Sequence, residues 1–142
     1  MSANHELADQ LAQVLLFSRC SRGALRSIAR HAQVVTLPAG SVVVAEDEAG
    51  DALVVVLDGC AVVRDGEVKV DEVGAGGSFG ELAIFDGQCA TTTVVARSDV
   101  RIAVIGRRSF RALVREYGDI AEQLLTTFAG ELRDARYVPH EG

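Results

Sequence analysis

The pattern of apolar and polar positions divides the chain into three zones, with helical spacing at both ends and strand spacing between them. In the first zone apolar residues recur three or four positions apart, or side by side: Leu7, Leu11, Val14 and Leu15. Ser21 is placed to cap a second helix, because its side-chain oxygen can accept a hydrogen bond from a free backbone N–H at the helix start. We therefore expect helices over about residues 7–32.

The middle zone, about residues 34–105, alternates short apolar segments with turn residues. Asp65-Gly66 lies between two valine-containing segments, which predicts a two-residue hairpin turn. The pattern predicts strands at residues 34–37, 41–45, 52–57, 60–64, 67–73, 91–96 and 100–105. Short strands at this spacing are typical of a sandwich, a jelly roll or a small barrel.

Helical spacing returns near the C-terminus, over about residues 109–135. Ser109 is a candidate N-cap for a helix that ends at Glu116. The Tyr117-Gly118 pair then interrupts the chain, and Asp119 is a candidate cap for a longer helix. One face of that helix is apolar, and it could either pack on the β-roll of the same chain or serve as an interaction surface: Ile120, Leu124, Phe128 and Leu132.

Together the three zones predict an α+β fold that is mainly β. We expect an antiparallel β-roll of the jelly-roll (double-stranded β-helix) type, flanked by N-terminal and C-terminal helices. The chain has 142 residues, of which 49% are hydrophobic, so residues 1–142 suit one packed domain. Aromatic residues make up only 5%, and the fourteen glycines and long valine runs indicate many short strands joined by tight turns.

Charge and cysteine usage narrow the classes of partner. Twenty acidic against fourteen basic residues give a net charge of −6, which argues against a direct nucleic-acid partner. Three widely spaced cysteines without a CxxC pair fit reduced thiols. The first residues lack the basic region of a signal peptide, and the longest apolar run, Ala52–Leu57, is too short to span a bilayer. We therefore expect a cytoplasmic protein that does not enter a membrane.

Residues suited to catalysis or metal binding do not cluster in the sequence. The three histidines all lie outside the strand zone: His5, His31 and His140. This placement argues against a metal enzyme built on the β-roll, and no cofactor is expected. The acidic turn at residues 46–51 lacks the order of ligands of a calcium loop. We expect no enzymatic activity, and Arg107-Arg108-Arg111 is the place where a partner anion could dock.

One segment, residues 76–87, breaks the rhythm of strand and turn. Its glycine pair, Gly76-Gly77, leads into what reads as a single helical turn at residues 80–84. Glu81 lies at the start of that turn, where its carboxylate could accept hydrogen bonds from sugar hydroxyls. The plain alternative is a β-turn followed by a short helical stub.

This segment resembles the phosphate-binding cassette of the cyclic nucleotide-binding domain family. The resemblance rests on Phe79-Gly80-Glu81-Leu82-Ala83-Ile84, followed by Thr91-Thr92-Thr93-Val94-Val95-Ala96. It extends over about residues 11–132 and is of the type found in the catabolite activator protein and in the regulatory subunit of cyclic-AMP-dependent kinase. It implies a β-roll with flanking helices.

The resemblance also implies roles for single residues. Backbone amides around Gly80–Ala83 would face the ligand, and Glu81 would accept the ribose 2′-hydroxyl. The arginine that pairs with the cyclic phosphate is replaced by Ala90, which supplies neither charge nor a donor. Thr91 offers one hydroxyl. The expected ligand-binding residues are Phe79, Gly80, Glu81, Leu82, Ala83, Ala90 and Thr91.

Two hypotheses of function follow. The first is a regulatory or sensory module that binds cyclic AMP or cyclic GMP weakly, or a related ligand, through residues 79–91. The alternative is a pseudo-sensor that binds no nucleotide and acts as an interaction domain. In that role the apolar C-terminal helix would form a homodimer or contact a downstream effector partner.

Overall fold

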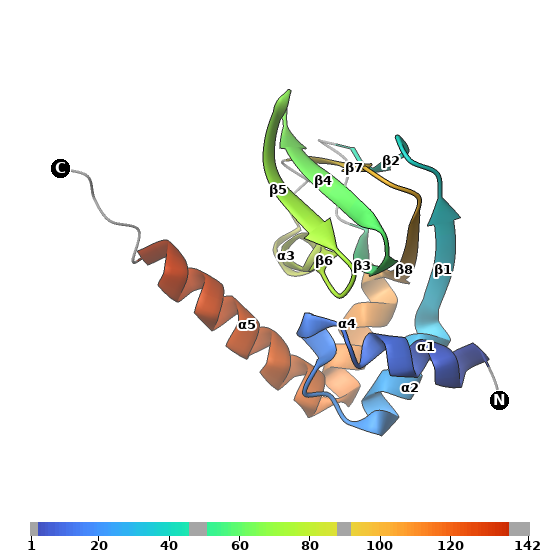
Figure 1. Cartoon of the computed structure of the whole chain (residues 1–142). Helices are drawn as coiled ribbons and strands as arrows, with labels where there is room; N and C mark the ends of the chain where they lie inside the picture. The colour runs from blue at the N-terminus through green and yellow to red at the C-terminus, as the bar shows by residue number, and fades with distance from the viewer. Residues whose placement is uncertain (1–2, 46–50, 88–91, 137–142) are drawn as a thin grey trace.

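The computed structural model describes residues 3–45, 51–87 and 92–136, and Figure 1 shows a β-roll with helices packed at one end of it. The helices are α1 (Ala3–Leu11), η1 (Leu15–Phe17), α2 (Arg22–His31), α3 (Glu81–Asp86), α4 (Arg107–Glu116) and α5 (Gly118–Arg136). Ser21 caps α2 as expected, because its Oγ accepts the backbone N–H of Ala24 at 3.2 Å.

The roll consists of two four-stranded antiparallel sheets. Its strands are β1 (Ala32–Leu37), β2 (Val42–Val44), β3 (Ala52–Asp58), β4 (Cys60–Asp65), β5 (Val68–Gly74), β6 (Ser78–Phe79), β7 (Thr93–Ala96) and β8 (Val100–Gly106). The orders are β1-β8-β3-β6 and β2-β7-β4-β5. The expected mainly-β α+β architecture is thus confirmed. Strand β6 was not expected from the sequence, because two residues are too few to show an alternating pattern of apolar and polar positions.

The continuous apolar run of β3 is explained by its position between two cores. Leu53 and Val55 face the helices and belong to the larger core, whereas Val54 faces the interior of the roll. Strand β8 pairs with β3 and divides in the same way, with Ile105 on the helical side and Ile102 on the roll side. Because both faces of these strands are covered, neither strand alternates apolar with polar residues.

Polar contacts between distant segments fix the base of α5. The Asp119 carboxylate accepts the backbone N–H of Ser21 at 2.6 Å, and the Gln123 amide oxygen accepts that of Arg19 at 3.0 Å. The hydroxyls of Ser27 and Tyr117 lie 2.6 Å apart. Figure 1 shows α5 leaving the helical end of the molecule from this base and projecting away from the roll.

The structure corrects three local predictions. The N-cap of α4 is Gly106 and not Ser109, which lies inside the first turn. Helix α5 begins at Gly118, one residue before the expected cap Asp119. The turn between β4 and β5 consists of Gly66 and Glu67, because Asp65 still pairs with Val68. A register shift after Val63 moves that turn by one residue from the expected Asp65-Gly66.

In the portion of the chain that the structure describes, no helix combines the length and the apolar character that a bilayer crossing requires.

Candidate functional site

The strand-to-helix turn at β6 and α3 lies directly against β3. Residues Ser78 and Phe79 pair with Val55 and Val54, and Gly80 follows with a φ of +95°. A Cβ at Gly80 would lie 2.5 Å from the Ala52 carbonyl oxygen. A side chain is therefore excluded both by the backbone conformation and by this close approach.

Glu81 is the first residue of α3, and its carboxyl group is turned inward. Its Oε2 atom is buried and has no hydrogen-bond partner among the described residues. Burial raises the pKa of this carboxyl, and a hydrogen bond from the residue's own backbone N–H partly opposes that rise. The site thus presents a buried, unused acceptor, which is suited to a ligand hydroxyl.

The rest of the helical turn holds Glu81 in place. Ile84 is fully buried in the core, and the ring of Phe85 packs edge-on against that of Phe110 at 6.2 Å between centroids. Leu82 has 55% of its surface exposed. These contacts explain why a six-residue helix is ordered here, although so short a helix is not stable by itself.

The structure brings five of the seven expected site residues together in one turn. Phe79 and Gly80 lead into α3, and Glu81, Leu82 and Ala83 form its first residues. The two other expected residues, Ala90 and Thr91, lie outside the described residues, as does Cys89.

A charge on helix α5 also influences the Glu81 carboxyl. The negative charge of Glu131 acts on the Glu81 carboxyl and raises its pKa further, after burial. In Figure 1 α5 leaves the helical end on the side of the roll that carries α3. Fifty positions separate the two glutamates, and no motif links them, so only the path of α5 reveals the relation.

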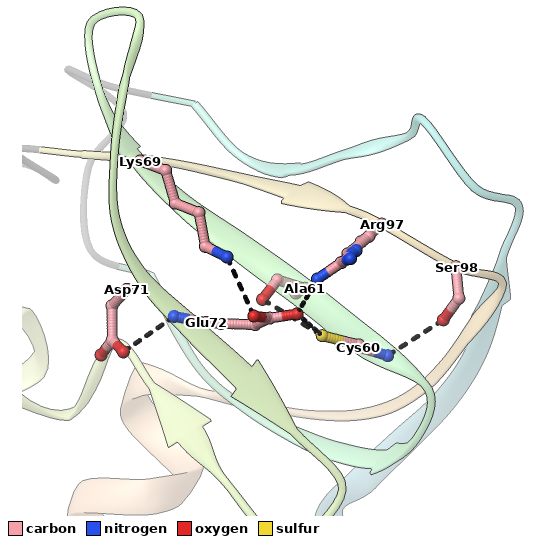
Figure 2. Close-up of polar contacts among 7 residues, drawn as sticks. All are labelled: Cys60, Ala61, Lys69, Asp71, Glu72, Arg97 and Ser98. Carbon is pink, nitrogen blue, oxygen red and sulfur yellow. Dashed lines mark hydrogen bonds and ion pairs between the residues drawn. The ribbon is translucent and has the colours of Figure 1, made fainter.

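A second polar cluster surrounds Cys60 at the start of β4 (Figure 2). Its thiol donates to Glu72 Oε1 at 2.9 Å, Lys69 contacts Oε2 of the same carboxylate at 2.9 Å, and Arg97 also pairs with it. The hydrogen bond to Glu72 raises the pKa of the Cys60 thiol. Burial and the charge of Asp119 raise the pKa of Cys20 to about 11. Both thiols therefore stay protonated at neutral pH.

Two other features bear on candidate chemistry: metal-binding side chains and the surroundings of the arginines at the start of α4. Within residues 3–45, 51–87 and 92–136, no group of three or more His, Cys, Asp or Glu side chains is placed to hold a metal ion. The Arg107 guanidinium lies 3.8 Å from where a Cβ on Gly87 would be, beside the C-terminal end of α3. A cation is favourable there, next to the free carbonyl groups of the last turn.

Comparison with known sequences gives one family. The cyclic nucleotide-binding domain family matches residues 34–117. A CRP-like cAMP-activated global transcriptional regulator of Mycobacterium tuberculosis is 31% identical over 128 residues, which cover 87% of this chain and 57% of that protein. A cAMP-dependent protein kinase regulatory subunit of Aspergillus niger is 34% identical over 112 residues, covering 78% of this chain and 27% of that protein. The chain thus spans from about a quarter to just over half of these relatives.

Solved structures share the same fold. The regulatory domain of Toxoplasma gondii PKA with cAMP has a TM-score of 0.78 at 25% identity, covering 90% of this chain and 50% of that one. The sensor domain of the transcriptional regulator DNR from Pseudomonas aeruginosa has a TM-score of 0.81 at 16% identity, covering 99% and 97%. At 16% identity, the second likeness concerns the fold alone.

Proposed function

Since the chain belongs to the cyclic nucleotide-binding domain family, of the type found in CRP-like regulators and PKA regulatory subunits, we propose that it acts as one regulatory or sensory module. Its site, residues 79–91, binds cyclic AMP or cyclic GMP weakly, or a related ligand with the same ribose hydroxyls. The observation that carries the proposal is the buried Oε2 of Glu81, which has no partner among the described residues.

A ribose hydroxyl is the donor that this carboxyl lacks. A buried polar group without a partner costs about 1–3 kcal/mol, so a ligand that supplies the hydrogen bond removes that cost. Gly80 supports the role, because its close contact with Ala52 fixes where α3 begins and therefore where Glu81 lies. The relatives are regulators and channels, and we propose that this chain also senses a ligand in the cytoplasm and catalyses no reaction.

Weak binding of the cyclic phosphate follows from Ala90. The resemblance places an arginine at this position, and a charge-assisted hydrogen bond from its guanidinium contributes about 1.5–3 kcal/mol. Losing one such bond lowers affinity by roughly 10–100-fold. A methyl side chain provides no replacement for either the charge or the donors.

Calorimetric titration with cyclic AMP and cyclic GMP tests the proposal. We expect micromolar binding by the wild type, its loss in Glu81→Ala, and a gain of about one to two orders of magnitude in Ala90→Arg. Glu122→Ala is the matched control, because Glu122 is exposed on α5 and should leave binding unchanged. The proposal would be contradicted if neither the wild type nor Ala90→Arg bound either nucleotide.

A second candidate function is dimerisation or effector binding through α5, with no nucleotide bound. Two residues of the expected apolar face, Ile120 and Leu124, are buried in the core of the chain itself and so are not free for a partner. The candidate is favoured instead by a neighbouring row spaced alternately four and three positions apart, as in a coiled-coil seam: Ala121, Leu125, Phe128 and Leu132. Leu125 and Leu132 have 69% and 59% of their surfaces exposed. Both leucines are thus available to a second copy or to a downstream partner.

Sedimentation equilibrium distinguishes this candidate. If α5 forms a dimer, Leu125→Ser and Leu132→Ser should weaken association, whereas Thr126→Ser on a neighbouring exposed position should not. A wild type that stays monomeric at all concentrations would exclude the homodimer. If the serine variants still bind nucleotide, then dimerisation and ligand binding use different surfaces.

A further inference from the structure

Half of the basic residues of the chain lie on two helices that pack against each other, α2 and α4. These helices hold seven of the fourteen basic residues and one acidic residue, Glu116. Seven arginines and one glutamate give the two helices a net charge of +6, so the rest of the chain, whose total is −6, carries −12. The molecule therefore has a basic helical end on an otherwise acidic chain.

The arginines of α2 form a row on the exposed side of the helix. Arg22, Arg26 and Arg30 are exposed and four positions apart, which places them along one side over about 12 Å. The Arg30 guanidinium donates to Ser27 Oγ at 2.8 Å, and this hydroxyl lies 2.6 Å from that of Tyr117 at the end of α4. The last turns of the two helices therefore meet, and Figure 1 shows both at the helical end of the molecule.

Folding does not account for these charges. The N-terminus of a helix carries partial positive charge, so a cation is unfavourable in the first turn. Arg108 is nevertheless the second residue of α4, and neither helix has an acidic residue in its first turn. Among the described residues, Arg22 pairs with Asp9 at 2.6 Å, whereas Arg26, Arg108 and Arg115 have no carboxylate partner. The exposed guanidinium groups are thus available to an external anion.

We propose that α2 and α4 form a docking surface for an acidic segment of a partner protein, whose carboxylates pair with arginines of both helices. We call this the basic surface, and it consists of Arg22, Arg26, Arg30, Arg108, Arg111 and Arg115. It goes beyond the proposed function, because it does not use the Glu81 site and does not depend on a bound nucleotide.

The distribution of charge favours an acidic protein segment over other anionic partners. A guanidinium binds a carboxylate through two parallel hydrogen bonds. A nucleic acid or an anionic membrane would extend past the basic surface over the remaining chain, whose −12 charge repels it. A short acidic helix can stay within the surface. Carboxylates at every fourth position of such a helix repeat about every 6 Å, as the arginines of α2 do.

Two synthetic helical peptides test the proposal, one with glutamate at every fourth position and one with glutamine there. Fluorescence anisotropy at low ionic strength should show that the full chain binds the glutamate peptide about tenfold or more tightly than the glutamine peptide. Arg26→Gln, Arg108→Gln and Arg115→Gln should each lower the affinity by about two- to fivefold, and the triple variant by roughly tenfold or more. Arg64→Gln is the matched control, because Arg64 is exposed on β4 of the roll and should leave the affinity unchanged.

Competing partners form further arms of the experiment: a single-stranded oligonucleotide of the same charge and vesicles that contain an anionic phospholipid. Tighter binding of either than of the glutamate peptide would overturn the choice of an acidic protein. Equal binding of the two peptides, or an equal loss in Arg64→Gln and Arg108→Gln, would overturn the role of the basic surface.

Urea unfolding separates docking from folding. Arg108→Gln should keep or raise the free energy of unfolding, because it removes a cation from the start of α4. A clear loss of stability would assign Arg108 to folding and would also count against the proposal. Nucleotide binding at Glu81 should be the same in all these variants, so a failure here leaves the proposed function standing.

Discussion

At the scale of single residues, the site is built from a glycine that allows close contact and a glutamate that this contact places. Gly80 brings the chain within reach of the β3 backbone, and Glu81 follows at once with its carboxyl turned inward. An inward carboxyl without a partner lowers the stability of the fold. Its presence at this position agrees with the proposed role of Glu81 in ligand binding.

The conformation of Gly80 leads to a prediction for stability. Gly80→Ala should lower the free energy of unfolding by about 1–3 kcal/mol, because a side chain is strained at this φ and meets the Ala52 carbonyl. Urea unfolding followed by circular dichroism measures the change. Gly23→Ala in α2 is the control, since a Cβ there meets nothing within 4 Å and should be neutral or stabilising.

Removing the charge of Glu81 should raise the stability of the fold at neutral pH. Burial raises the folded-state pKa of this carboxyl, so its contribution to stability is present below the unfolded value of about 4.3 and is lost as pH rises through the folded value. At pH 7, Glu81→Gln should therefore unfold at a higher temperature than the wild type, because it removes the charge that burial disfavours. Thermal unfolding between pH 4 and 7 checks this, and equal curves for both proteins at pH 7 would contradict it.

The hydrogen bond from Cys60 to Glu72 leads to a prediction for the rate of alkylation. Glu72→Gln should lower the pKa of the Cys60 thiol, because it removes the carboxylate that accepts the hydrogen bond of the thiol. The charges of Arg97 and Lys69 remain and still favour the thiolate. We expect faster reaction with iodoacetamide at Cys60, resolved from Cys20 by peptide mass spectrometry. Asp71→Asn should change little, because Asp71 contacts only the backbone N–H of Glu72 within this cluster (Figure 2). An unchanged rate in Glu72→Gln would refute the role of the carboxylate.

At the scale of elements, the base of α5 decides where the helix points. Two contacts join α5 to the segment between η1 and α2, and a third joins Tyr117, just before α5, to Ser27 inside α2. The side chains of Ser27 and Gln123 in these contacts are buried. Beyond Leu124 the helix exposes more of each turn. The direction of the exposed half, with Leu125, Glu131 and Leu132, therefore depends on contacts that lie at its other end.

The hydrogen bond between Tyr117, just before α5, and Ser27 leads to a prediction for stability. Tyr117→Phe should lower the free energy of unfolding by about 1 kcal/mol, because it removes the hydroxyl that pairs with the buried Ser27. Ser27→Ala should do the same, and the double variant should cost less than the sum of both. Urea unfolding of the three variants completes the cycle. Fully additive losses would show that the two hydroxyls do not stabilise each other.

At the scale of the whole molecule, the sequence predicted the architecture because hydrophobic spacing and turn residues agree over most of the chain. It did not predict β6, which is held by pairing with β3 and not by its own two residues. It misplaced the start of α4, because Gly106 leaves β8 directly into the helix while Ser109 has the more usual capping side chain.

The candidate site was predictable in part, and for a physical reason. The turn at Gly80 and Glu81 is a local feature, so neighbouring residues in the sequence determine it. Glu131 could not be predicted, because its relation to Glu81 depends on the direction of α5, which the contacts at Ser21 and Ser27 fix. An electrostatic influence between residues so far apart in the sequence depends on the packed structure.

The position of β3 and β8 between two cores has a consequence for how the molecule opens. Since Leu53 and Val54 belong to different cores on one strand, neither core can come apart without disturbing the other. Backbone amides of β3 and β8 should therefore exchange with deuterium only when the whole chain unfolds, whereas those of the exposed edge strand β5 should exchange through local fluctuations. Hydrogen exchange read by mass spectrometry would then give two rates. The slower should follow the global free energy of unfolding in every variant described above.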